Sequence, residues 1–564
     1  MNALLLTGTA VAAAGILADI SGRTRRWLHI FQLEHYEAAR LIMWWRRRPD
    51  LRHPLQLATS VAALAGAATC LVIGREEVAS LLLVAIGVVS FPIAYLEWRR
   101  PEKRPFVFTG RARRVFIVSL VPALLFLLAT AGVVAADAVS ASAITALTAI
   151  GLALVAAAPL SLAAADLALS PAQKRINRRY VGAARAKLAA IRPLTVGITG
   201  SYGKTTTKFC VGAVLSRLGE TLVTPESFNS YLGVTRTVNE RLRSDHRFFV
   251  VEMGAYRRGD IAGLCELTTP RVGIVTAIGP MHLERFGSIE AIRDTKAELV
   301  ASLPSYGHFI TNGDDPRCRS IADAATVPVT LFALDADDAE VRASDVRISS
   351  GTTCFTLHLC ERSYPVRARL LGRHNVRNLL AAAACGLVAG VADEQIVSAL
   401  EAVEPPPHRL AAIVNPRTGV VVIDDAYNSN PEGAAGALEV LAEHDANRRL
   451  LVTPGMVELG PGQETANVEL GQRAARVCDL VLLVGGEQTE PIERGLLDAG
   501  LNRTQIIVAR DIDHATEELS RIVQPGDVVL FENDLPDTYV RNGPMQGVQR
   551  APRLRRPPGT RVAH

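Results

Sequence analysis

The sequence predicts an α/β protein whose N-terminal third is a helical membrane region of about five transmembrane helices. Two observations indicate this fold class. Roughly the first 170 residues hold five long apolar runs, which is the pattern of membrane helices. From Pro193 onward, short apolar runs rich in β-branched residues alternate with helical stretches, which is typical of α/β domains with parallel sheets.

A cluster of prolines at Glu404–His408 divides the α/β part and predicts a hinge between two domains. The tail of the chain is rich in proline and arginine and has too few apolar residues to order itself. The predicted regions are a membrane region (residues 1–170), a basic linker (171–192), a first α/β domain (193–403), a second α/β domain (404–543) and a disordered tail (544–564).

Composition narrows the class of protein further. A chain of 564 residues that is 49% hydrophobic is long enough for several domains and too apolar to be wholly soluble. The net charge of +5 is small, and the basic residues cluster beside apolar segments, so no nucleic-acid partner is expected. The eight cysteines include no Cys-x-x-Cys pair, which argues against a zinc site or a disulfide framework and favours a reducing compartment.

The five apolar runs each have about the length that spans a bilayer. Arginine and lysine clusters follow the first and fifth runs, precede the second, and separate the third from the fourth, whereas the two remaining loops carry a single positive charge. The positive-inside rule then predicts a multi-pass inner-membrane protein with its N-terminus outside and its catalytic domains in the cytoplasm. The predicted spans are Ala3–Ile20, Leu55–Ile73, Val78–Leu96, Val115–Ala136 and Val139–Ala165, with an interfacial helix at Trp27–Trp45.

The α/β part begins with the stretch Leu194–Lys208, which reads as strand, glycine loop and helix. Gly200 and Gly203 allow backbone N–H groups to turn toward a phosphate, and Lys204 adds a positive charge. Thr205 offers a hydroxyl to Mg²⁺, and Ser201 and Thr206 complete the expected nucleotide-binding loop. The spacing departs from the common phosphate-loop motif, which would place a glycine at Ile198. The first α/β domain is therefore predicted to be a P-loop ATPase domain.

Further polar residues follow apolar runs that we expect to be strands, where open α/β sheets bind ligands. Glu252 closes one such run and is either a buried hydrogen-bond acceptor or a Mg²⁺ ligand. The loop at Thr224–Val234 either reaches the nucleotide or is ordinary surface, and His282 and Lys296 on their own are ordinary polar residues. The expected strands are Phe248–Glu252, Arg271–Thr276, Gly307–Thr311, Val420–Asp424, Leu450–Thr453, Leu480–Val484 and Val528–Phe531.

Two asparagine-containing motifs complete the candidates. Asn375 and Asn378 precede an alanine-rich helix, where they either cap the helix or contact the edge of an adenine ring. The stretch Asp424–Pro431 places two carboxylates and two asparagines after a strand, which favours a functional loop over a simple turn.

Together these motifs resemble the Mur ligase family, the ATP-dependent amide ligases that act on peptidoglycan precursors. The resemblance covers Pro193 to about Tyr539 and is strongest to the branch that adds D-alanyl-D-alanine. The motifs that carry it are Gly-Ser-Tyr-Gly-Lys-Thr-Thr-Thr-Lys at 200–208, Val-Glu-Met-Gly at 251–254, His-Leu-Glu-Arg-Phe-Gly-Ser at 282–288, Thr-Lys-Ala-Glu at 295–298, Gly-Arg-His-Asn at 372–375, Asp-Asp-Ala-Tyr-Asn-Ser-Asn-Pro at 424–431 and Gly-Met-Val-Glu-Leu-Gly at 455–460.

The resemblance implies a central ATPase domain, a Rossmann-like C-terminal domain that closes over it, ATP, and two Mg²⁺ ions. It implies that Lys296 is carbamylated and that the metal ligands are Thr205, Glu252, His282 and Lys296. The implied catalytic residues are Lys204, His282, Lys296 and Asp425. The implied nucleotide-binding residues are Gly200, Ser201, Gly203, Lys204, Thr205, Thr206, Asn375, Asn378, Arg409 and Asp425.

Three departures from the family pattern bear on the substrate. Membrane spans replace the amino-terminal domain that recognises a UDP-sugar. The stretch Phe531–Asp537 stands where these ligases carry a Lys-Gly-Ser turn, and His408 replaces a glycine before Arg409. Asn467 stands where a histidine is usual.

The resulting hypothesis is a membrane-anchored amide ligase that passes through an acyl phosphate. Its partners would be a nucleotide, a carboxylate acceptor, an amino-acid or dipeptide amine, and the lipid bilayer. Two alternatives stay open: a membrane-bound polymer-forming ligase similar to the poly-γ-glutamate synthases, and a membrane ATPase that makes no amide.

Overall fold

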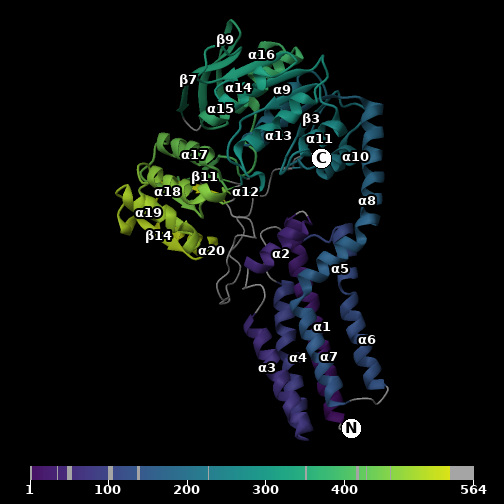
Figure 1. Ribbon diagram of the computed structural model, residues 1–564. Helices are drawn as coiled ribbons and strands as arrows, with labels where there is room; N and C mark the ends of the chain where they lie inside the picture. Colours follow the sequence, from purple (N-terminus) through teal and green to yellow (C-terminus); the bar gives the residue numbers. More distant parts are fainter. Residues whose placement is uncertain are drawn as a thin grey trace. The chain divides into compact units, whose positions relative to one another are not determined.

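The computed structural model describes residues 3–34, 36–47, 54–99, 106–135, 140–226, 228–281, 283–349, 352–414, 418–426, 429–457 and 459–533. The predicted disordered tail lies outside these residues. The chain forms two compact units that divide between Arg178 and Arg179, and each is described by itself (Figure 1).

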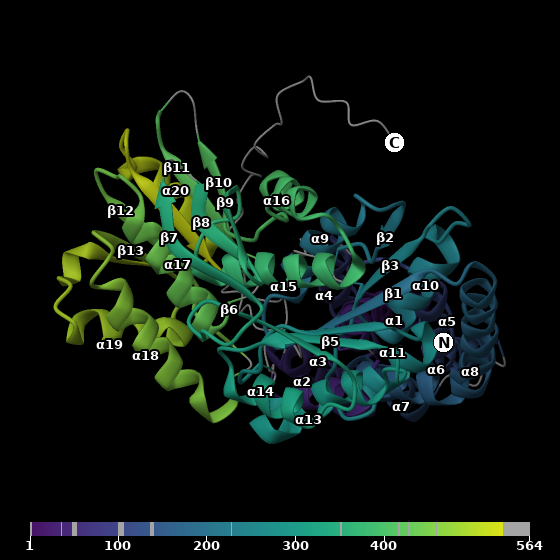
Figure 2. The same ribbon diagram turned by 90° about the horizontal axis from the view of Figure 1, so that it is seen from above.

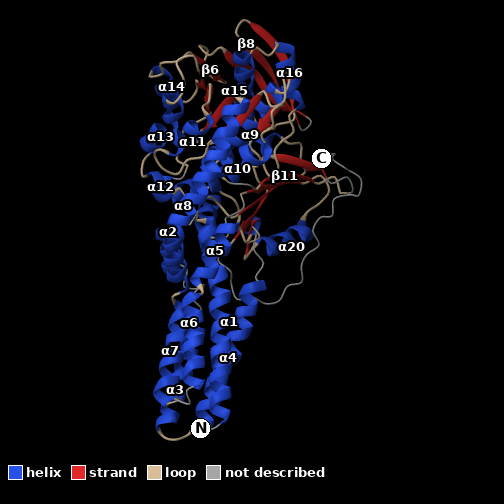
Figure 3. Ribbon diagram, turned by 90° about the vertical axis from the view of Figure 1, so that its right-hand side faces the viewer, coloured by secondary structure: helices blue, strands red, loops and turns tan. Residues whose placement is uncertain are grey.

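Within its described residues the N-terminal unit consists of helices and connecting loops, without a strand (Figure 3). Its helices are α1 (Ala3–Leu33), α2 (Ala38–Arg47), α3 (Pro54–Val72), α4 (Glu76–Arg99), α5 (Gly110–Ser119), α6 (Val121–Ala135), α7 (Ala141–Ala156) and the start of α8 (Ala158–Ile191).

Helices α1 and α4 pack against each other along a stripe of small residues. Gly8, Gly15 and Gly22 of α1 face residues of α4 that have the same seven-residue spacing, namely Ser80, Gly87 and Ala94. A Cβ on Gly15 would come within 2.5 Å of the Cα of Gly87, so the two backbones are in direct contact. Close backbone approach at small residues is typical of helix pairs in membranes. Because both sets of positions increase together, α1 and α4 run parallel.

The five predicted spans are only partly confirmed. Among the described residues, three helices are long and apolar enough to cross a membrane: Leu4–Leu33, Glu76–Trp98 and Gly110–Gly132. The second predicted span is a shorter apolar helix, Leu57–Val72. The fifth is broken into Ser142–Ala156 and Ala158–Ile191, which meet at a bend of 72°, so up to four spans are counted if this pair is one.

The interfacial helix predicted at Trp27–Trp45 is wrong as a single element. Helix α1 continues to Leu33 and α2 begins at Ala38. The arginines expected to flank the first span therefore lie inside α1, where Arg23 pairs with Asp19 at 2.8 Å on the same helix face.

The second unit contains a nine-stranded mixed sheet with the order β2-β3-β1-β4-β5-β6-β7-β8-β9. The strands from β2 to β7 are parallel, and β7, β8 and β9 form an antiparallel meander. The expectation of a purely parallel sheet is thus corrected at this edge. The strands are β1 (Leu194–Thr199), β2 (Thr221–Val223), β3 (Phe248–Glu252), β4 (Val272–Val275), β5 (His308–Asn312), β6 (Val329–Ala333), β7 (Val341–Ser349), β8 (Thr352–Leu359) and β9 (Arg362–Ala368).

Helices cover both faces of this sheet, which makes three layers (Figure 2). One apolar core lies under α9 (Lys204–Leu215), α15 (Arg373–Ala389) and α16 (Asp393–Ala402). The other lies under the end of α8 together with α10 (Tyr231–Arg241), α11 (Asp260–Thr268), α13 (Ile289–Ala301) and α14 (Pro316–Asp323). A short helix, α12 (Leu283–Phe286), precedes α13.

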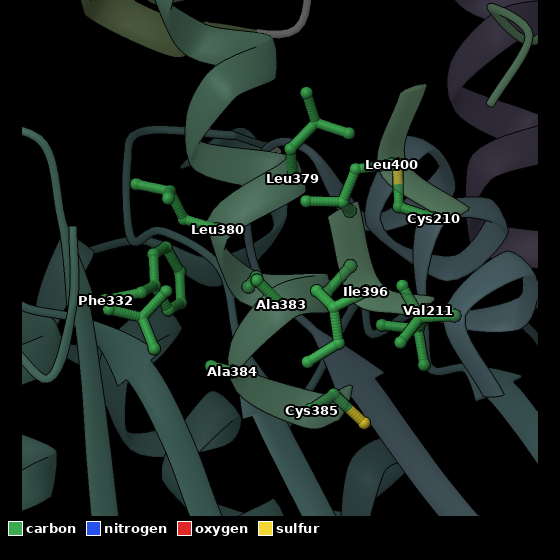
Figure 4. Close-up of a cluster of buried hydrophobic side chains, with 14 of the residues drawn as sticks. Cys210, Val211, Phe332, Leu379, Leu380, Ala383, Ala384, Cys385, Ile396 and Leu400 are labelled. Atoms are coloured by element: carbon green, nitrogen blue, oxygen red, sulfur yellow. The ribbon is translucent and has the colours of Figure 1, made fainter. Parts of the chain in front are cut away.

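The alanine-rich helix α15 lies in the centre of the first core (Figure 4). Ala383, Ala384 and Cys385 are fully buried, and Leu379 and Leu380 fill the space toward neighbouring elements. Small side chains let α15 approach the sheet and α9 closely. This packing holds the first turns of α15 beside the glycine loop.

A six-stranded sheet follows, with the order β10-β11-β15-β12-β13-β14. Only β10 is antiparallel to its neighbour. Helices α17, α18 and α19 cover one face and α20 covers the other. The elements are β10 (Ala411–Val414), β11 (Val421–Asp425), α17 (Pro431–Glu443), β12 (Arg449–Thr453), α18 (Gln463–Ala474), β13 (Leu480–Val484), α19 (Glu490–Asp498), β14 (Ile506–Ala509), α20 (Ile512–Ile522) and β15 (Val528–Glu532).

Candidate active site

The glycine loop joins the carboxyl end of β1 to the start of α9, as the sequence predicted. Ser201 anchors it to the loop after β4, because its N–H donates to the carbonyl of Ala277 at 2.7 Å and its hydroxyl exchanges hydrogen bonds of 3.0 Å with Gly279. The ammonium of Lys204 donates to the carbonyls of Gly200 and Ser201, at 2.6 and 3.1 Å. The loop is thus a fixed cradle beside the first turn of a helix, where an anion is favoured.

Position 203 requires a glycine, because its backbone has a left-handed conformation and a side chain would have no room. Its φ is +77°, and a Cβ there would lie 2.3 Å from Oδ1 of Asn378. The same Oδ1 accepts a hydrogen bond of 3.1 Å from Thr207 on α9, while the amide nitrogen of Asn378 donates to Asn375 at 2.9 Å. Asn378 therefore supports the loop from α15.

The alternative that the two asparagines cap a helix is wrong. Gly372 is the residue before α15, and both asparagines lie inside its first two turns. Asn375 is buried and donates to the carbonyl of Leu371 at 2.8 Å. Both amides thus face inward, next to the glycine loop.

Glu252 lies at the carboxyl end of β3, next to Ile198 of β1. One of its oxygens is 3.0 Å from the ammonium of Lys208, and both side chains are almost completely buried. The other accepts from the amide of Asn229 at 2.9 Å, and the backbone N–H of Glu252 donates to the hydroxyl of Thr224. Burial raises the pKa of Glu252, but Lys208 and Lys204 outweigh it, so that its pKa lies below the ordinary value.

Two lysines at this site have lowered pKa values. Burial lowers the pKa of Lys204 to about 8, with Glu252 opposing and Arg409 adding to the effect. Lys296, buried on α13, has its pKa lowered to about 7 by burial and by the positive charge of Lys204. A substantial fraction of the Lys296 side chain is therefore an uncharged amine at neutral pH.

The predicted metal ligands are only partly described by the structure. His282 lies outside the described residues. Within the part of the chain that the structure describes, no group of three or more His, Cys, Asp or Glu side chains could hold a metal. Glu252 and Thr205 nevertheless fit the chemistry of Mg²⁺, because this ion is usually bound by one or two carboxylates together with substrate phosphates and water.

The second sheet contributes polar residues at the carboxyl ends of β11 and β15. Asp425 and Glu532 are strand partners. Glu532 is 1% exposed and accepts from the hydroxyl of Ser429 at 2.5 Å, while Asp425 accepts from the N–H of Leu410 at 3.1 Å. Burial raises the pKa of Asp425 to about 6, and burial together with Asp425 raises the pKa of Glu532 well above its ordinary value.

His408, the residue before Arg409, has an unusual backbone conformation. Its φ is +59°, a left-handed conformation that costs a residue with a side chain about 1 kcal/mol. The imidazole compensates, because Nδ1 lies 2.8 Å from a carboxylate oxygen of Asp424.

Several contacts bring the two α/β regions together at this site. Arg377 of α15 donates to Glu432 in the first turn of α17 at 3.0 Å. The charge of Glu432 also raises the pKa of Tyr202 in the glycine loop, although burial is the larger cause. Arg409 influences both Lys204 and Asp425. The first turn of α17 therefore contacts α15, whose first turns lie beside the glycine loop.

Sequence reasoning missed several residues of this site. Lys208 follows Lys204 by one helical turn, so it shares the face of α9 that meets Glu252, and this spacing was a usable signal. Asn229 and Thr224 lie in the loop for which a role was left open. Ser429 and Glu532 meet only through strand pairing, for which the local sequence offers no signal.

A glycine loop at the carboxyl end of a parallel sheet, faced by a second α/β domain, defines a nucleotide-binding α/β enzyme. The family model of the Mur ligase middle domain matches residues 198–386, and that of the Mur ligase glutamate ligase domain matches residues 408–532. The chain belongs to the Mur ligase family, and it is an ADP-forming acid–amino-acid ligase.

Curated relatives and solved structures agree with this assignment. The UDP-N-acetylmuramoyl-tripeptide--D-alanyl-D-alanine ligase of Mycobacterium tuberculosis is 36% identical over 372 residues, which cover 62% of this chain and 72% of the relative. The Escherichia coli ligase of the same name is 35% identical over 354 residues, 62% of this chain and 77% of the relative.

Two solved structures share the fold. MurF from Acinetobacter baumannii aligns with a TM-score of 0.58 and 28% identity, covering 64% of this chain and 78% of that structure. MurF from Thermotoga maritima, in complex with ADP, aligns with a TM-score of 0.58 and 26% identity, covering 64% and 81%.

Proposed function

We propose that this protein is a membrane-anchored ligase that uses ATP to join D-alanyl-D-alanine, or a related amine, to a carboxylate of a peptidoglycan precursor. The observation that carries the proposal is the glycine loop with Lys204 and Glu252, faced by Arg409 and Asp425 of the second α/β domain. The names of the curated relatives supply the amine and the precursor.

In this proposal the glycine loop binds the phosphates of ATP. Backbone N–H groups of the loop other than that of Ser201, which donates to Ala277, surround the phosphates, and the ammonium of Lys204 leaves the loop carbonyls to neutralise the γ-phosphate. Asn375 and Asn378 meet the adenine, a role that rests on the family resemblance. Arg409 and Asp425 complete the nucleotide site from the second domain.

Thr205 and Glu252 would hold one Mg²⁺, and His282 and Lys296 a second. Glu252 fits this role because a carboxylate has about four lone-pair sites, of which Lys208 and Asn229 use two. A carbamate on Lys296 is consistent with its burial, since only an uncharged amine reacts with CO₂. When bound, Mg²⁺ supplies positive charge that lets a carboxylate approach the γ-phosphate.

The reaction then has two steps. An oxygen of the acceptor carboxylate attacks the γ-phosphorus, the bond to the β-phosphate oxygen breaks, and an acyl phosphate and ADP form. The amine nitrogen attacks the acyl carbon, loses a proton, and phosphate leaves with the carboxylate oxygen. Contacts such as Arg377 with Glu432 help to hold the two domains together, and closure of the domains would keep water from hydrolysing the acyl phosphate.

In this proposal the N-terminal unit anchors the enzyme in the inner membrane, with its catalytic domains in the cytoplasm. Three apolar helices and the bent pair support this anchoring, and five spans require that the shorter apolar helix Leu57–Val72 also crosses the membrane. The parallel packing of α1 and α4 supports the topology, because it puts the start of α1 and the weakly charged turn before α4 at the same end of the bundle.

The test uses the full-length protein in detergent with ATP, Mg²⁺, UDP-N-acetylmuramoyl-tripeptide and a panel of amino acids and dipeptides. Mass spectrometry should find one amide formed for each ADP, with D-alanyl-D-alanine as the preferred amine. Repeated addition of one amino acid would favour a polymer-forming ligase instead. ATP turnover that is indifferent to every carboxylate and amine would contradict the proposal.

A further inference from the structure

The ion pair between Lys208 and Glu252 places a positive charge at the carboxylate that the proposed function assigns to a metal. Nζ of Lys208 lies 3.0 Å from Oε2 of Glu252, and the two side chains are 0% and 1% exposed. The other carboxylate oxygen accepts from a neutral donor, the amide of Asn229, at 2.9 Å. The negative charge of Glu252 is therefore already neutralised by a cation that belongs to the chain itself.

The loop between β2 and α10 holds both members of this ion pair in place. The ammonium of Lys208 also donates to the backbone carbonyl of Glu226. On the other side, the hydroxyl of Thr224 accepts from the N–H of Glu252 at 3.1 Å, and Asn229 binds the carboxylate. Moving the lysine away from Glu252 would leave a buried charge without its partner, which is costly. Lys208 is thus a permanent neighbour of the carboxylate.

The same lysine lies close to the second residue that the proposed function assigns to this metal. Lys208 follows Thr205 by three residues on α9, so the two side chains share one face of the helix. Lys204, one turn before Lys208, adds a second positive charge that stabilises the ionised form of Glu252. Two lysines outweigh one carboxylate, so these side chains do not attract a free divalent cation. The phosphates of ATP would supply the negative charge that is lacking.

We propose that Lys208 is a built-in counter-cation that keeps Mg²⁺ from binding at Glu252 until ATP supplies its phosphates. The inference rests on the proposed function, in which Glu252 is a ligand of Mg²⁺. Lys208 acts through Glu252 and contacts no substrate, so it is a positioning residue. It keeps the carboxylate ionised and oriented, and it makes metal binding depend on the nucleotide. No covalent step is involved.

The experiment measures the binding of Mn²⁺ in the absence of nucleotide to the full-length protein in detergent. Mn²⁺ takes the same oxygen ligands as Mg²⁺, and electron paramagnetic resonance quantifies the free ion, so the measurement does not depend on activity. Lys208→Met removes the charge and keeps an unbranched side chain. Lys208→Gln is also neutral and can still donate to the carbonyl of Glu226, so it replaces the methionine variant if that variant does not fold.

Two variants serve as controls. Lys208→Arg keeps the positive charge, and Lys174→Met removes an exposed lysine of α8. Binding of a non-hydrolysable ATP analogue shows that each variant has a folded glycine loop. Hydrogen exchange of the β3 amides gives a second measurement, because a metal that binds only the folded state slows exchange.

We expect Lys208→Met to bind Mn²⁺ without nucleotide at least about tenfold more tightly than the wild type. A unit charge within about 5 Å of a divalent ion has at least this effect, even with the screening of bulk water. The gain should vanish in the double variant Lys208→Met/Glu252→Gln, and both controls should bind Mn²⁺ as the wild type does. Mg²⁺ alone should slow exchange in β3 of Lys208→Met only. A lysine that merely supports the fold would give the opposite sign, because its loss would weaken metal binding.

Two results would overturn this inference and leave the proposed function intact. The first is equal or weaker binding of Mn²⁺ without nucleotide in a neutral variant that still binds the ATP analogue. The second is a gain that persists in the double variant, because the metal would then not be bound at Glu252. If Glu252→Gln alone does not weaken Mn²⁺ binding in the presence of the ATP analogue, the metal assignment of the proposed function itself fails.

Discussion

The buried ion pair between Lys208 and Glu252 should be essential for the stability of the loop region. Nζ and Oε2 are 3.0 Å apart, and the two side chains are 0% and 1% exposed. Removing one partner of a buried pair costs about 3–5 kcal/mol, because the other charge stays buried. Asn229 and Lys204 still stabilise the charge of Glu252 when Lys208 is removed. We therefore expect Lys208→Met to lower the local free energy of unfolding by about 3 kcal/mol, at the lower end of this range.

A double-mutant cycle isolates the pair. Glu252→Gln alone should cost about 2 kcal/mol, since Lys208 keeps its hydrogen bond to the carbonyl of Glu226. The double variant contains neither charge, so its loss should be smaller than the sum of the two single losses by about 2 kcal/mol.

The assay is hydrogen exchange of the β3 amides in the full-length protein, because a chain with two compact units does not unfold as one cooperative step. Lys174→Met, at an exposed lysine on α8, should leave exchange in β3 unchanged. Single losses that add within about 0.5 kcal/mol would refute the reasoning, since they would mean that the two side chains do not interact.

Three further predictions follow from the site. Gly203→Ala should raise the KM for ATP at least about tenfold, because the new Cβ would clash with Asn378, and steady-state kinetics with a circular-dichroism check of folding measures this. The stability of Glu532→Gln relative to the wild type should increase as pH rises above about 4. The wild-type protein loses stability over this range, because the pKa of the Glu532 carboxyl is higher in the folded than in the unfolded state. Melting curves at several pH values test this, and a stability difference that does not depend on pH would contradict it. Arg377→Ala should lower kcat/KM by no more than about tenfold, because a partly exposed ion pair with Glu432 contributes about 1 kcal/mol or less; inactivation would indicate a larger role.

The parts of the site that the sequence revealed are those with a local signal. The strand, glycine loop and helix around Gly200 and Lys204 are contiguous, so their order alone predicts a phosphate site. Of the partners of Glu252, Lys208 had a local signal in its spacing from Lys204, whereas Asn229 had none, because it reaches Glu252 from a separate loop. The register of β11 and β15, which pairs Asp425 with Glu532, is likewise set by the whole sheet.

The elements of the fold that were predicted are likewise those with a local sequence signal. The apolar parallel strands, such as β3 and β13, were predicted at their observed bounds because buried strands are continuous apolar runs. The antiparallel strands β7 to β9 were missed, because the prediction relied on continuous apolar runs, whereas β8 shows the period-2 alternation of a half-buried strand. Helix α1 extends beyond its predicted end, and Arg23 within the extension pairs with Asp19, a contact that composition alone does not reveal.

The most direct test of the proposed reaction follows one oxygen atom. UDP-N-acetylmuramoyl-tripeptide whose acceptor carboxylate carries a heavy oxygen isotope is incubated with the full-length protein, ATP, Mg²⁺ and D-alanyl-D-alanine. If an acyl phosphate forms, each phosphate released carries one heavy oxygen from the carboxylate, and mass spectrometry detects one labelled phosphate for each amide. Unlabelled phosphate released together with amide would contradict the acyl phosphate, and phosphate released without amide would contradict the ligase activity.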